Sequence, residues 1–519
     1  MHPFRSFMLG LLAALACAGC NDKLFNDFTG GSDSGSGSNG SRGTLLQNPP
    51  ESRGVLSAAA LLLQLGADAN QQVLALGGTP LCDIAVYHIQ YNTVGAKDEA
   101  TTASGALMVP TGGDSKCTGA RPILLYAHGT STDKGFDLSM VADGSNAEAV
   151  ALAAFFAAQG YIVVAPNYAG YDTSTLTYHP YLIADQQSKD MIDALTAARR
   201  ALPVADAATS RDDGRLFITG YSQGGYVAMA TQRAMQAAGM TVTASAPLSG
   251  PYTIAAFVDA VFEGQVNADG PIAFTFLATG YQQAYGDIYS HASDVFESQY
   301  ANGIDTLLPS TLARSDLFAQ GLLPQSALFS ATPPDPSFAG ITPAKAPANL
   351  ATVFAQGFGS NNLVTNSYRL TYLRDAQANP DGDFPTTTTG NPAAAPALSL
   401  RVRLKQNDLR TEWTPTAPTL LCAGNSDPTV FFMNTQFMQG FWASRSPASL
   451  AVVDIDSRAA NDPYDDLRSG FADAKNIVAA AAVAGGATDG GAAAVLEAYH
   501  STLVAPFCIA VAAKFFASQ

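Results

Sequence analysis

Residues 216–225 read LFITGYSQGG, an apolar run that passes directly into the pattern G-x-S-x-G. An Ala-rich segment of helical character begins at Tyr226. A strand, a tight turn and a helix in this order are the context in which a serine is projected above a sheet as a nucleophile. Gly220 and Gly224 have no Cβ atom, so the strand and the helix can approach each other closely. We therefore expect Ser222 to be a nucleophile.

Strands and helices alternate on both sides of this turn. Continuous apolar runs predict buried strands, and the segments between them have helical spacing. The expected strands are 121–127, 161–166, 216–220 and 242–248, and the expected helices are 147–159, 185–201 and 226–238. This alternation predicts an α/β fold with a mostly parallel sheet. Ahead of it, we expect 45–77 to be helical, and 84–94 and 100–110 to form an antiparallel strand pair.

The alternation stops near Gly250 and returns at residue 417. Between 251 and 416 the sequence is mostly apolar and aromatic, and only four basic residues lie between 251 and 400. We interpret 251–416 as an inserted, mainly helical cap, and 45–250 and 417–519 as the two parts of one core. In the second part the expected elements are a strand at 417–423, a helix at 429–442, a strand at 449–455 and a last helix at 504–517.

Composition excludes several classes of function. The chain has 27 Lys and Arg against 43 Asp and Glu, a net charge of −16, and no basic stretch. This charge opposes binding to nucleic acid, which requires clustered cations. The sequence has no H-E-x-x-H, no paired C-x-x-C with His, no P-loop and no G-x-G-x-x-G after the first strand. It therefore predicts no metal site and no nucleotide site.

A nucleophilic serine needs a base and an acid to orient that base. In enzymes built on this strand–turn–helix unit the chain order is serine, acid, base. Only His500 follows the strand at 449–455 and precedes the last helix, so it is the expected base. Asp427, in the loop after the strand at 417–423, is the expected acid, although its place before Pro428 also suits a helix N-cap. The rival acids are Asp454 and Asp456.

An oxyanion hole is expected from two backbone N–H groups, those of Gln223 and Thr130. The His128-Gly129 step follows the strand at 121–127 and places the N–H of Thr130 beside the nucleophile. We expect His128 to orient this loop rather than to act as a base. The residues expected to line the pocket are His128, Tyr168, Asp172 and Tyr221.

The N-terminus has the features of an export signal. Residues 1–19 contain one basic residue, Arg5, and an apolar run at 7–16 that is too short to span a bilayer. The small pair before Cys20 is similar to a bacterial lipoprotein signal, and residues 20–44 continue as a Gly- and Ser-rich tether. We expect a lipid anchor at Cys20, in the bacterial outer membrane, with simple cleavage and secretion or a periplasmic location as the alternative.

Four cysteines remain after the signal: Cys82, Cys117, Cys422 and Cys508. An even number in an exported chain favours disulfides. Three connectivities can be formed, and the most local one, Cys82–Cys117 with Cys422–Cys508, is preferred over the other two and over four free thiols.

Together these features resemble the α/β-hydrolase superfamily, and more narrowly the secretory lipase family, whose members are esterases with a large helical cap. The resemblance rests on YAHGT at 126–130, GYSQGG at 220–225, CAGNSDPTV at 422–430 and YHS at 499–501, together with the long insertion. It covers the chain from about residue 50 onward. It implies ester hydrolysis by a triad of Ser222, Asp427 and His500, with no cofactor.

Three classes of function compete. An esterase or lipase that acts on neutral, apolar esters is favoured, because the cap is poor in Arg and Lys and rich in Phe, Tyr and Leu. A serine peptidase of the prolyl-oligopeptidase type is the second reading, although no long all-β repeat precedes the core. A non-catalytic binding protein is the third. The expected partner is a small-molecule ester.

Overall fold

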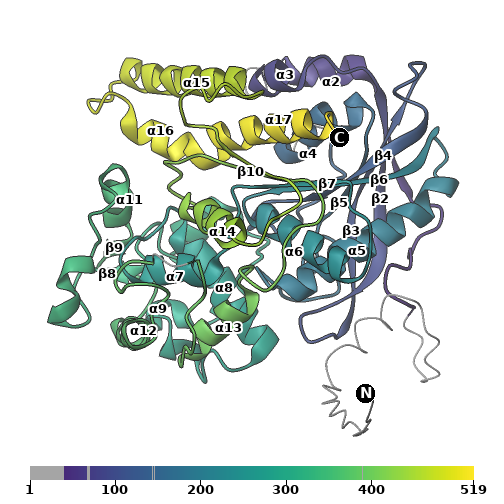
Figure 1. Ribbon diagram of the computed structural model, residues 1–519. Coiled ribbons are helices and arrows are strands. Elements are labelled where there is room, and N and C mark those ends of the chain that lie inside the picture. Colours follow the sequence, from purple (N-terminus) through teal and green to yellow (C-terminus); the bar gives the residue numbers. More distant parts are fainter. Residues whose placement is uncertain (1–39, 67–70, 143, 145, 388–389) are drawn as a thin grey trace, which may run out of the picture. The chain divides into compact units, whose positions relative to one another are not determined.

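A nine-stranded sheet is the framework of the described chain, with the strand order β1-β2-β3-β5-β4-β6-β7-β10-β11 (Figure 1). Its strands are β1 (Glu51–Leu56), β2 (Asp83–Val94), β3 (Ala100–Thr111), β4 (Gly119–Ala127), β5 (Ile162–Pro166), β6 (Ser210–Tyr221), β7 (Ala244–Leu248), β10 (Thr419–Ala423) and β11 (Leu450–Asp454). The strands from β5 to β11 in this order are parallel, and β1, β2 and β3 are antiparallel to their neighbours. The α/β-hydrolase fold class expected from the sequence is confirmed.

The computed structural model describes residues 40–519, except 67–70, 143, 145 and 388–389. The expected signal at 1–19, the expected lipid site Cys20 and most of the tether lie outside the described residues. Residues 40–519 form one unit.

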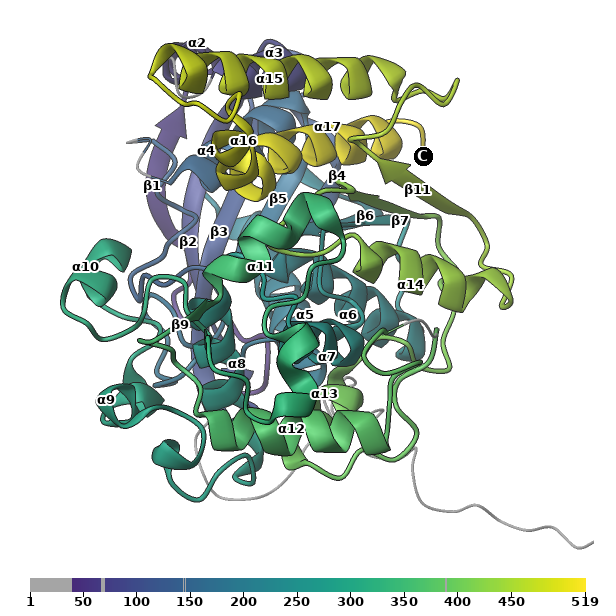
Figure 2. The same ribbon diagram turned by 90° about the vertical axis from the view of Figure 1, so that its left-hand side faces the viewer.

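Helices cover both faces of the sheet (Figures 1 and 2). One face carries α4 (Ala147–Phe155) and α17 (Ala505–Phe516), with α2 (Ala58–Leu65), α3 (Gln71–Gly77) and α15 (Asp465–Ala484) outside them. The other face carries α5 (Ala184–Ala201) and α6 (Gln223–Ala237). α14 (Met433–Ala443) contacts β10. The bounds of α4, α5, α6, α14 and α17 agree with those of the expected helices to within about four residues.

The core between the sheet and α17 explains why the C-terminal helix belongs to the fold. Phe217 of β6 packs against Phe516 of α17 with ring centroids 4.9 Å apart. Leu124, Val163 and Val511 are fully buried in the same cluster. Burial of each large apolar side chain contributes about 1.5–3 kcal/mol, so α17 is held firmly against the strands.

The prediction of a helix over residues 45–77 was wrong. This segment contains β1 and then the two short helices α2 and α3. β1 pairs with β2, and its register shifts between Ser52 and Gly54, where Gly54 has a φ of 96°. The first part of this segment is a strand because it pairs with the edge of β2 through a bulge. The spacing of Leu and Ala along the sequence does not reveal this pairing. Ser57 then caps α2 by accepting a hydrogen bond from the backbone N–H of Ala60.

Between β7 and β10 the chain is mainly helical, as expected. It contains α7 (Ile254–Phe262), α8 (Gly270–Tyr285), α9 (Ser298–Ala301), α10 (Arg314–Ala319), α11 (Ala351–Gln356), α12 (Asn366–Ala378) and α13 (Ser399–Asn407). Two two-residue strands, β8 (Phe329–Ser330) and β9 (Phe358–Gly359), pair only with each other. Buried ion pairs connect these elements: Arg401 bonds to Asp259 and Asp375 at 2.7 and 2.9 Å.

The segment between β11 and His500 forms α15 and α16 (Ala492–Ala498), which the sequence patterns did not predict. α16 continues through the π-helical segment η8 (Tyr499–Val504) into α17. This run, Ala492–Phe516, is long and apolar enough to cross a membrane, but half of its most apolar window is buried. α17 contacts β6, β7 and β10, so in this fold it is a core helix.

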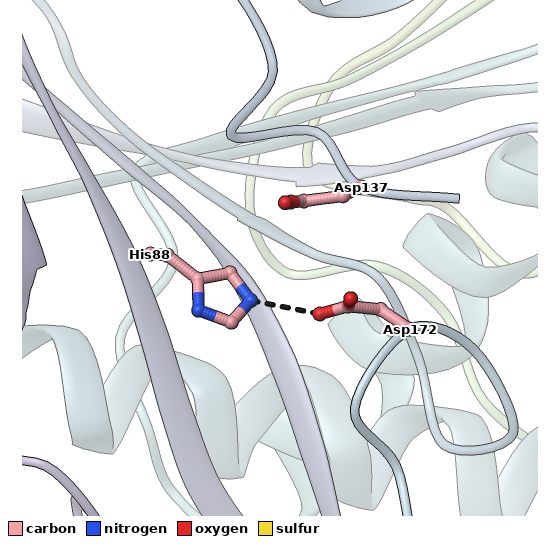
Figure 3. Close-up of side chains that lie close together, drawn as sticks. All are labelled: His88, Asp137 and Asp172. Atoms are coloured by element: carbon pink, nitrogen blue, oxygen red, sulfur yellow. Dashed lines mark hydrogen bonds and ion pairs between the residues drawn. The ribbon is translucent and has the colours of Figure 1, made fainter. Parts of the chain in front are cut away.

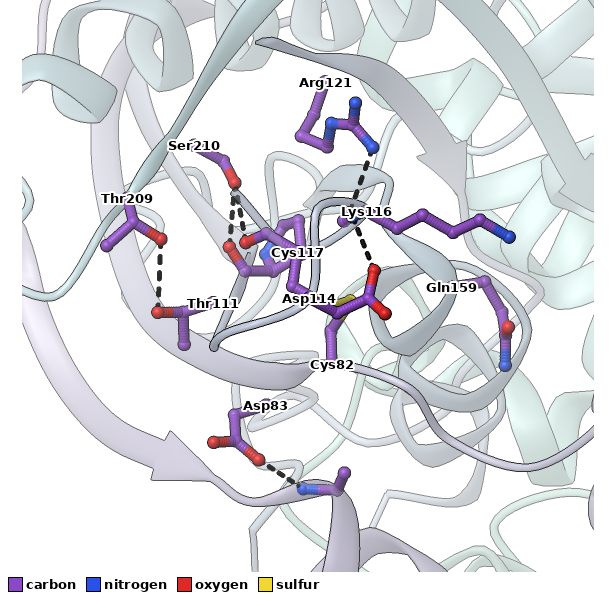
Figure 4. Close-up of a disulfide and its surroundings, with 12 residues drawn as sticks. Cys82, Asp83, Thr111, Asp114, Lys116, Cys117, Arg121, Gln159, Thr209 and Ser210 are labelled. Carbon is purple, nitrogen blue, oxygen red and sulfur yellow. Dashed lines mark hydrogen bonds between the residues drawn. A yellow bond between two sulfur atoms is a disulfide. The ribbon is translucent and has the colours of Figure 1, made fainter. Parts of the chain in front are cut away.

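Two disulfides have the connectivity preferred from the sequence. Cys82–Cys117 has a Cα separation of 5.3 Å and ties the start of β2 to the loop before β4 (Figure 4). Ser210 of β6 fastens the same loop by donating a hydrogen bond to the carbonyl of Cys117. Cys422–Cys508, with a Cα separation of 5.5 Å, ties β10 to α17.

Candidate active site

Ser222 lies in the tight turn between β6 and α6, as the sequence predicts. Its backbone has φ 59° and ψ −122°, a strained conformation for a residue with a side chain. A Cβ atom added to Gly224 would lie 1.9 Å from the carbonyl oxygen of Ala127, and one added to Gly220 would lie 2.4 Å from that of Gly224. Both glycines are therefore required by the close approach of β4, β6 and α6.

His500 lies in η8 and reaches Ser222 from the other end of the chain. Its Nε2 is 2.9 Å from Oγ of Ser222. The π-helical turn is a local widening of the helix, a feature often found at functional sites. Tyr221 donates a hydrogen bond to the backbone carbonyl of His500, which fastens this turn to the end of β6.

Asp427 lies in the loop after β10, and its Oδ2 is 2.7 Å from Nδ1 of His500. Its Oδ1 accepts hydrogen bonds from the backbone N–H groups of Thr429 and Val430 at 2.9 and 3.0 Å. Ser249, after β7, donates a further hydrogen bond to Oδ2 at 3.0 Å. The carboxylate is fully buried, and these four contacts fix its orientation.

The two rival acids have other partners. Asp454 accepts hydrogen bonds from Asn425, and Asp456 accepts one from Tyr499 at 2.6 Å and pairs with Lys475. Neither has a hydrogen bond to His500 among the described residues. The structure therefore brings Ser222, His500 and Asp427 together in one chain of hydrogen bonds and leaves Asp454 and Asp456 outside it.

Two backbone N–H groups beside Ser222 have no acceptor among the described residues, those of Gln223 and Thr130. Gln223 is the first residue of α6, so its N–H has no intrahelical partner. Its side-chain amide donates to Nε2 of His179 at 2.7 Å, and Nδ1 of His179 lies 3.0 Å from the carbonyl of Ala169. Burial lowers the pKa of His179 to about 3, so the ring is neutral and both bonds fit one tautomer.

Gly129, next to Thr130, is held on both of its peptide bonds. Its N–H donates to Oε1 of Glu148 at 3.1 Å, and its carbonyl lies 2.6 Å from Nδ1 of His128. Thr130 Oγ1 is 2.9 Å from the hydroxyl of Tyr181. Burial lowers the pKa of His128 to about 4, which is unsuited to a base near neutral pH. The ring of His128 lies against this loop, with its two nitrogens next to the carbonyl oxygens of Gly129 and Asn167.

Two of the expected pocket residues lie behind the pocket wall. His128 and Tyr168 are buried and stack with ring centroids 4.0 Å apart. The Tyr168 hydroxyl donates to the carbonyl of His128. Tyr221 does line the cavity. The sequence did not single out the supporting residues Glu148, His179 and Ser249, because each acts on a residue distant in the chain.

Asp172, also expected to line the pocket, belongs to a separate cluster with His88 and Asp137 (Figure 3). Nε2 of His88 is 2.7 Å from Oδ2 of Asp172. Burial alone would lower the pKa of His88, but the hydrogen bond to Asp172 and the charges of both aspartates raise it above 6.5. Ser104 donates to Asp172, and Arg53 lies 3.6 Å from Asp137. We interpret the cluster as a buried ion pair that joins β2 to the loop after β5.

The serine opens into a cavity of about 520 Å³. Ser222, Gln223, Thr130 and His500 all line it. Much of the remaining wall comes from α7 and α8 and from α3, α4, η8 and α17, and loop residues such as Tyr181, Asp269 and Thr429 complete it. In Figure 2, α3, α4 and α17 lie above the strands of the sheet, and α7 and α8 lie below them. The cavity thus extends in both directions from the serine.

Comparison with known proteins identifies the fold family. A family model described as the prolyl oligopeptidase family matches residues 149–263, which include the serine turn. The ligand-bound rice cell wall degrading esterase LipA from Xanthomonas oryzae is 26% identical with a TM-score of 0.61, covering 80% of this chain and 91% of that one. The chain belongs to the α/β-hydrolase superfamily. This hydrolase is lipase- or esterase-like in structure.

A second solved structure, a putative hydrolase from Legionella pneumophila, agrees with this assignment at the level of the fold. It is 17% identical with a TM-score of 0.60, covering 91% of this hydrolase and 97% of that chain. A search of curated proteins found no match. The two disulfides are typical of proteins that fold outside the cytosol, and the hydrolase is an exported protein.

Proposed function

We propose that this hydrolase is a serine carboxylic-ester hydrolase in which Ser222, His500 and Asp427 form the catalytic triad. The observation that carries the proposal is the continuous chain of hydrogen bonds from Oγ of Ser222 through His500 to Asp427, at 2.9 and 2.7 Å, in the wall of a cavity. A serine hydroxyl is a weak nucleophile unless an adjacent base accepts its proton. His500 is within reach to do so.

The proposed reaction has two halves. In the first, His500 accepts the proton of Ser222 as Oγ attacks the ester carbonyl carbon, and the tetrahedral intermediate then collapses as His500 protonates the leaving alcohol. In the second, His500 removes a proton from water as the water oxygen attacks the acyl carbon, and it then returns this proton to Oγ of Ser222 as the Oγ–acyl bond breaks and the acid leaves. Asp427 holds Nδ1–H of the imidazole and stabilises its charged form. These steps need no cofactor.

The oxyanion of both tetrahedral intermediates is assigned to the backbone N–H groups of Gln223 and Thr130. Support comes from their lack of other acceptors and from the rigid surroundings that His179, His128 and Glu148 provide. Donors that are already oriented stabilise developing charge without a cost of reorganisation. Loss of one such donor typically costs about 10²–10³ in kcat.

A preference for neutral esters is supported by the cavity wall. Its only cationic side chain among the described residues is Arg314, which pairs with Asp269. A substrate carboxylate would therefore be desolvated without a free cation to pair with it. We assign residues 251–416 to a cap, because α7 and α8 from this segment form one wall of the cavity.

The match to the prolyl oligopeptidase family makes a serine peptidase the alternative. Hydrolysis of p-nitrophenyl esters and of aminoacyl p-nitroanilides separates the two functions. We expect turnover of the esters, loss of nearly all turnover in Ser222→Ala, and unchanged turnover in Ser444→Ala, which replaces an exposed serine at the end of α14. Turnover of the anilides alone would favour the peptidase, and labelling of another serine by an organophosphate would exclude this triad.

We also propose lipidation at Cys20, on the sequence pattern at 16–20 and the tether that follows it. Such an anchor would hold the enzyme at the outer membrane, and the tether would keep its body clear of the surface. Mass spectrometry of the purified N-terminal peptide tests the proposal. A diacylglyceryl adduct on Cys20 supports it, and a free N-terminus at another residue contradicts it.

A further inference from the structure

The two sides of the cavity differ in chemistry. The helices α7 and α8 themselves contribute apolar side chains, Ile254, Phe257, Val261, Phe274 and Leu277, while the ion pair of Asp269 and Arg314 also lines the cavity near the start of α8. The side formed by α3, α4 and η8 is mixed, because Gln72, Glu148, Ser501 and Thr502 all line it. The surfaces of α7 and α8 match an apolar chain. Polar groups in the second side need partners when a substrate excludes water from them.

Glu148 is the most informative of these polar groups. It lies in the first turn of α4, where the helix dipole favours a carboxylate. Its Oε1 accepts two hydrogen bonds, from the Tyr126 hydroxyl at 2.7 Å and from the N–H of Gly129 at 3.1 Å. Its Oε2 has no hydrogen bond among the described residues, and the side chain is partly accessible and lines the cavity. One carboxylate oxygen is thus fixed by the protein and the other is available to a ligand.

Glu148 is also close to the reaction centre. Gly129, which donates to it, lies beside Ser222: a Cβ atom on Gly129 would be 3.9 Å from Cβ of Ser222. Gln72 of α3 lines the same side of the cavity, and its Nε2 is buried without a hydrogen-bond partner among the described residues. Glu148 therefore offers a free acceptor at the cavity wall next to the serine, whereas Nε2 of Gln72 has no accessible surface and lies behind that wall.

The position of His500 decides which half of an ester enters this space. The histidine must hand its proton to the leaving alcohol, so the alcohol departs on the side of the serine where Nε2 lies. Ser501 and Thr502 continue the wall directly from His500 in η8. The alcohol half therefore occupies the side of α3, α4 and η8, and the acyl half occupies the apolar side of α7 and α8.

We propose that the enzyme selects esters whose alcohol half carries a further free hydroxyl group, which Glu148 recognises. This inference rests on the proposed ester-hydrolase function. A hydroxyl group can donate its hydrogen to Oε2 of Glu148. A plain alkyl group in the same place would leave this oxygen desolvated and unpaired, and sites built in this way discriminate against analogues that lack the hydroxyl.

The test compares two esters that share an acyl group, 2,3-dihydroxypropyl butanoate and propyl butanoate. For the unaltered enzyme we expect kcat/KM to favour the hydroxylated ester by about 10- to 100-fold, the range for a hydrogen bond to a charged group. The ratio of the two kcat/KM values is the readout, so a general change in activity cancels. A ratio near one or below it in the unaltered enzyme overturns the proposal.

One variant locates the recognition. Glu148→Gln keeps an acceptor for Tyr126 and Gly129 but replaces the free, charged oxygen by a neutral amide N–H₂ group. We expect the ratio to fall about tenfold or more toward one, because the hydrogen bond to a charged acceptor is lost. Glu497→Gln, at an exposed position in α16, is the matched control and should keep the ratio of the unaltered enzyme. A ratio in Glu148→Gln equal to that of the unaltered enzyme overturns the assignment.

The outcome also distinguishes this inference from the function on which it rests. If Ser222→Ala hydrolyses either ester at the normal rate, the proposed triad fails. If Ser222→Ala is inactive and the unaltered enzyme shows no preference, the triad stands and the hydroxyl subsite fails. Circular dichroism and thermal melting of each variant identify a folding defect, and in that case the ratio of the unaltered enzyme alone decides.

Discussion

Replacing Asp427 by Asn should nearly abolish activity through the protonation state of His500. Oδ1 of Asp427 is held by two backbone N–H groups, from Thr429 and Val430. In the Asn variant the amide oxygen must keep this place, because the amide nitrogen cannot accept these bonds. The Asn nitrogen then takes the place of Oδ2, which is 2.7 Å from Nδ1 of His500, and it faces the ring as a donor.

This donor reverses the tautomer of the ring. With an N–H group opposite it, Nδ1 must be the acceptor, so the proton moves to Nε2, where it prevents acceptance of the proton of Ser222. In a well-studied triad the same change lowers kcat by about 10⁴, which corresponds to about 5.5 kcal/mol in the barrier. Both backbone bonds survive, so the free energy of unfolding should fall by less than about 2 kcal/mol.

The assay is the steady-state hydrolysis of a p-nitrophenyl ester, with urea unfolding as the measure of stability. Asp456→Asn is the matched control, because Asp456 bonds to Tyr499 and Lys475 and has no hydrogen bond to His500. We expect it to lose stability but to keep most of its kcat. An active Asp427→Asn beside an inactive Asp456→Asn would refute the reasoning and make Asp456 the acid.

Three further predictions follow from other parts of the structure. Removal of the Cys422–Cys508 bridge by a double Ala replacement should lower the free energy of unfolding by about 4–5 kcal/mol, given its sequence separation of 86, and should also lower ester turnover. The double Ala variant of Cys82 and Cys117 should lower stability alone. Equal turnover in both variants would contradict a link between the Cys422–Cys508 bridge and activity. Hydrogen bonds from His88 and Ser104 outweigh the effect of burial and lower the pKa of Asp172 below 3.8, whereas the pKa of His88 is raised above 6.5. Thermal melting at a series of pH values should therefore show the full stability from this pair between about pH 4 and 6.5. This stability should be lost as the pH falls through the lowered pKa of Asp172 and as it rises through the raised pKa of His88. If a His88→Gln variant has an unchanged pH profile, the pair is not the cause of the pH dependence. Gly224→Ala should lower the free energy of unfolding by about 3 kcal/mol or more, because the added Cβ would lie 1.9 Å from a backbone oxygen. An unchanged urea unfolding curve would show that β4 and α6 do not approach each other so closely.

The turn around Ser222 could be predicted because all of its determinants are local. An apolar strand, two glycines and a helix lie within residues 216–237, and each acts on its immediate neighbours. Asp427 and His500 could be placed through the order of elements along the chain, since parallel strands bring the loops at their carboxyl ends to one edge of a sheet.

The supporting residues could not be found in this way. In the sequence, Glu148 is simply an acidic residue in the first turn of a helix, and only the fold brings it into hydrogen-bond contact with Gly129. His179 lies in a loop that is distant in sequence from its partner Gln223. The edge strand β1 escaped prediction because it exists only through pairing with β2. These features depend on contacts between distant segments, for which local periodicity holds no signal.

The hydrogen bond between Ser222 and His500 joins residues 278 positions apart in the chain, and this separation has a consequence for biosynthesis. Ribosomes deliver the N-terminal part of a protein first. A growing chain therefore contains Ser222 long before His500 has been made. The hydrogen bond between them can form only after the segment that carries His500 has left the ribosome, so under the proposed mechanism ester hydrolysis has to wait for the C-terminal part of the chain.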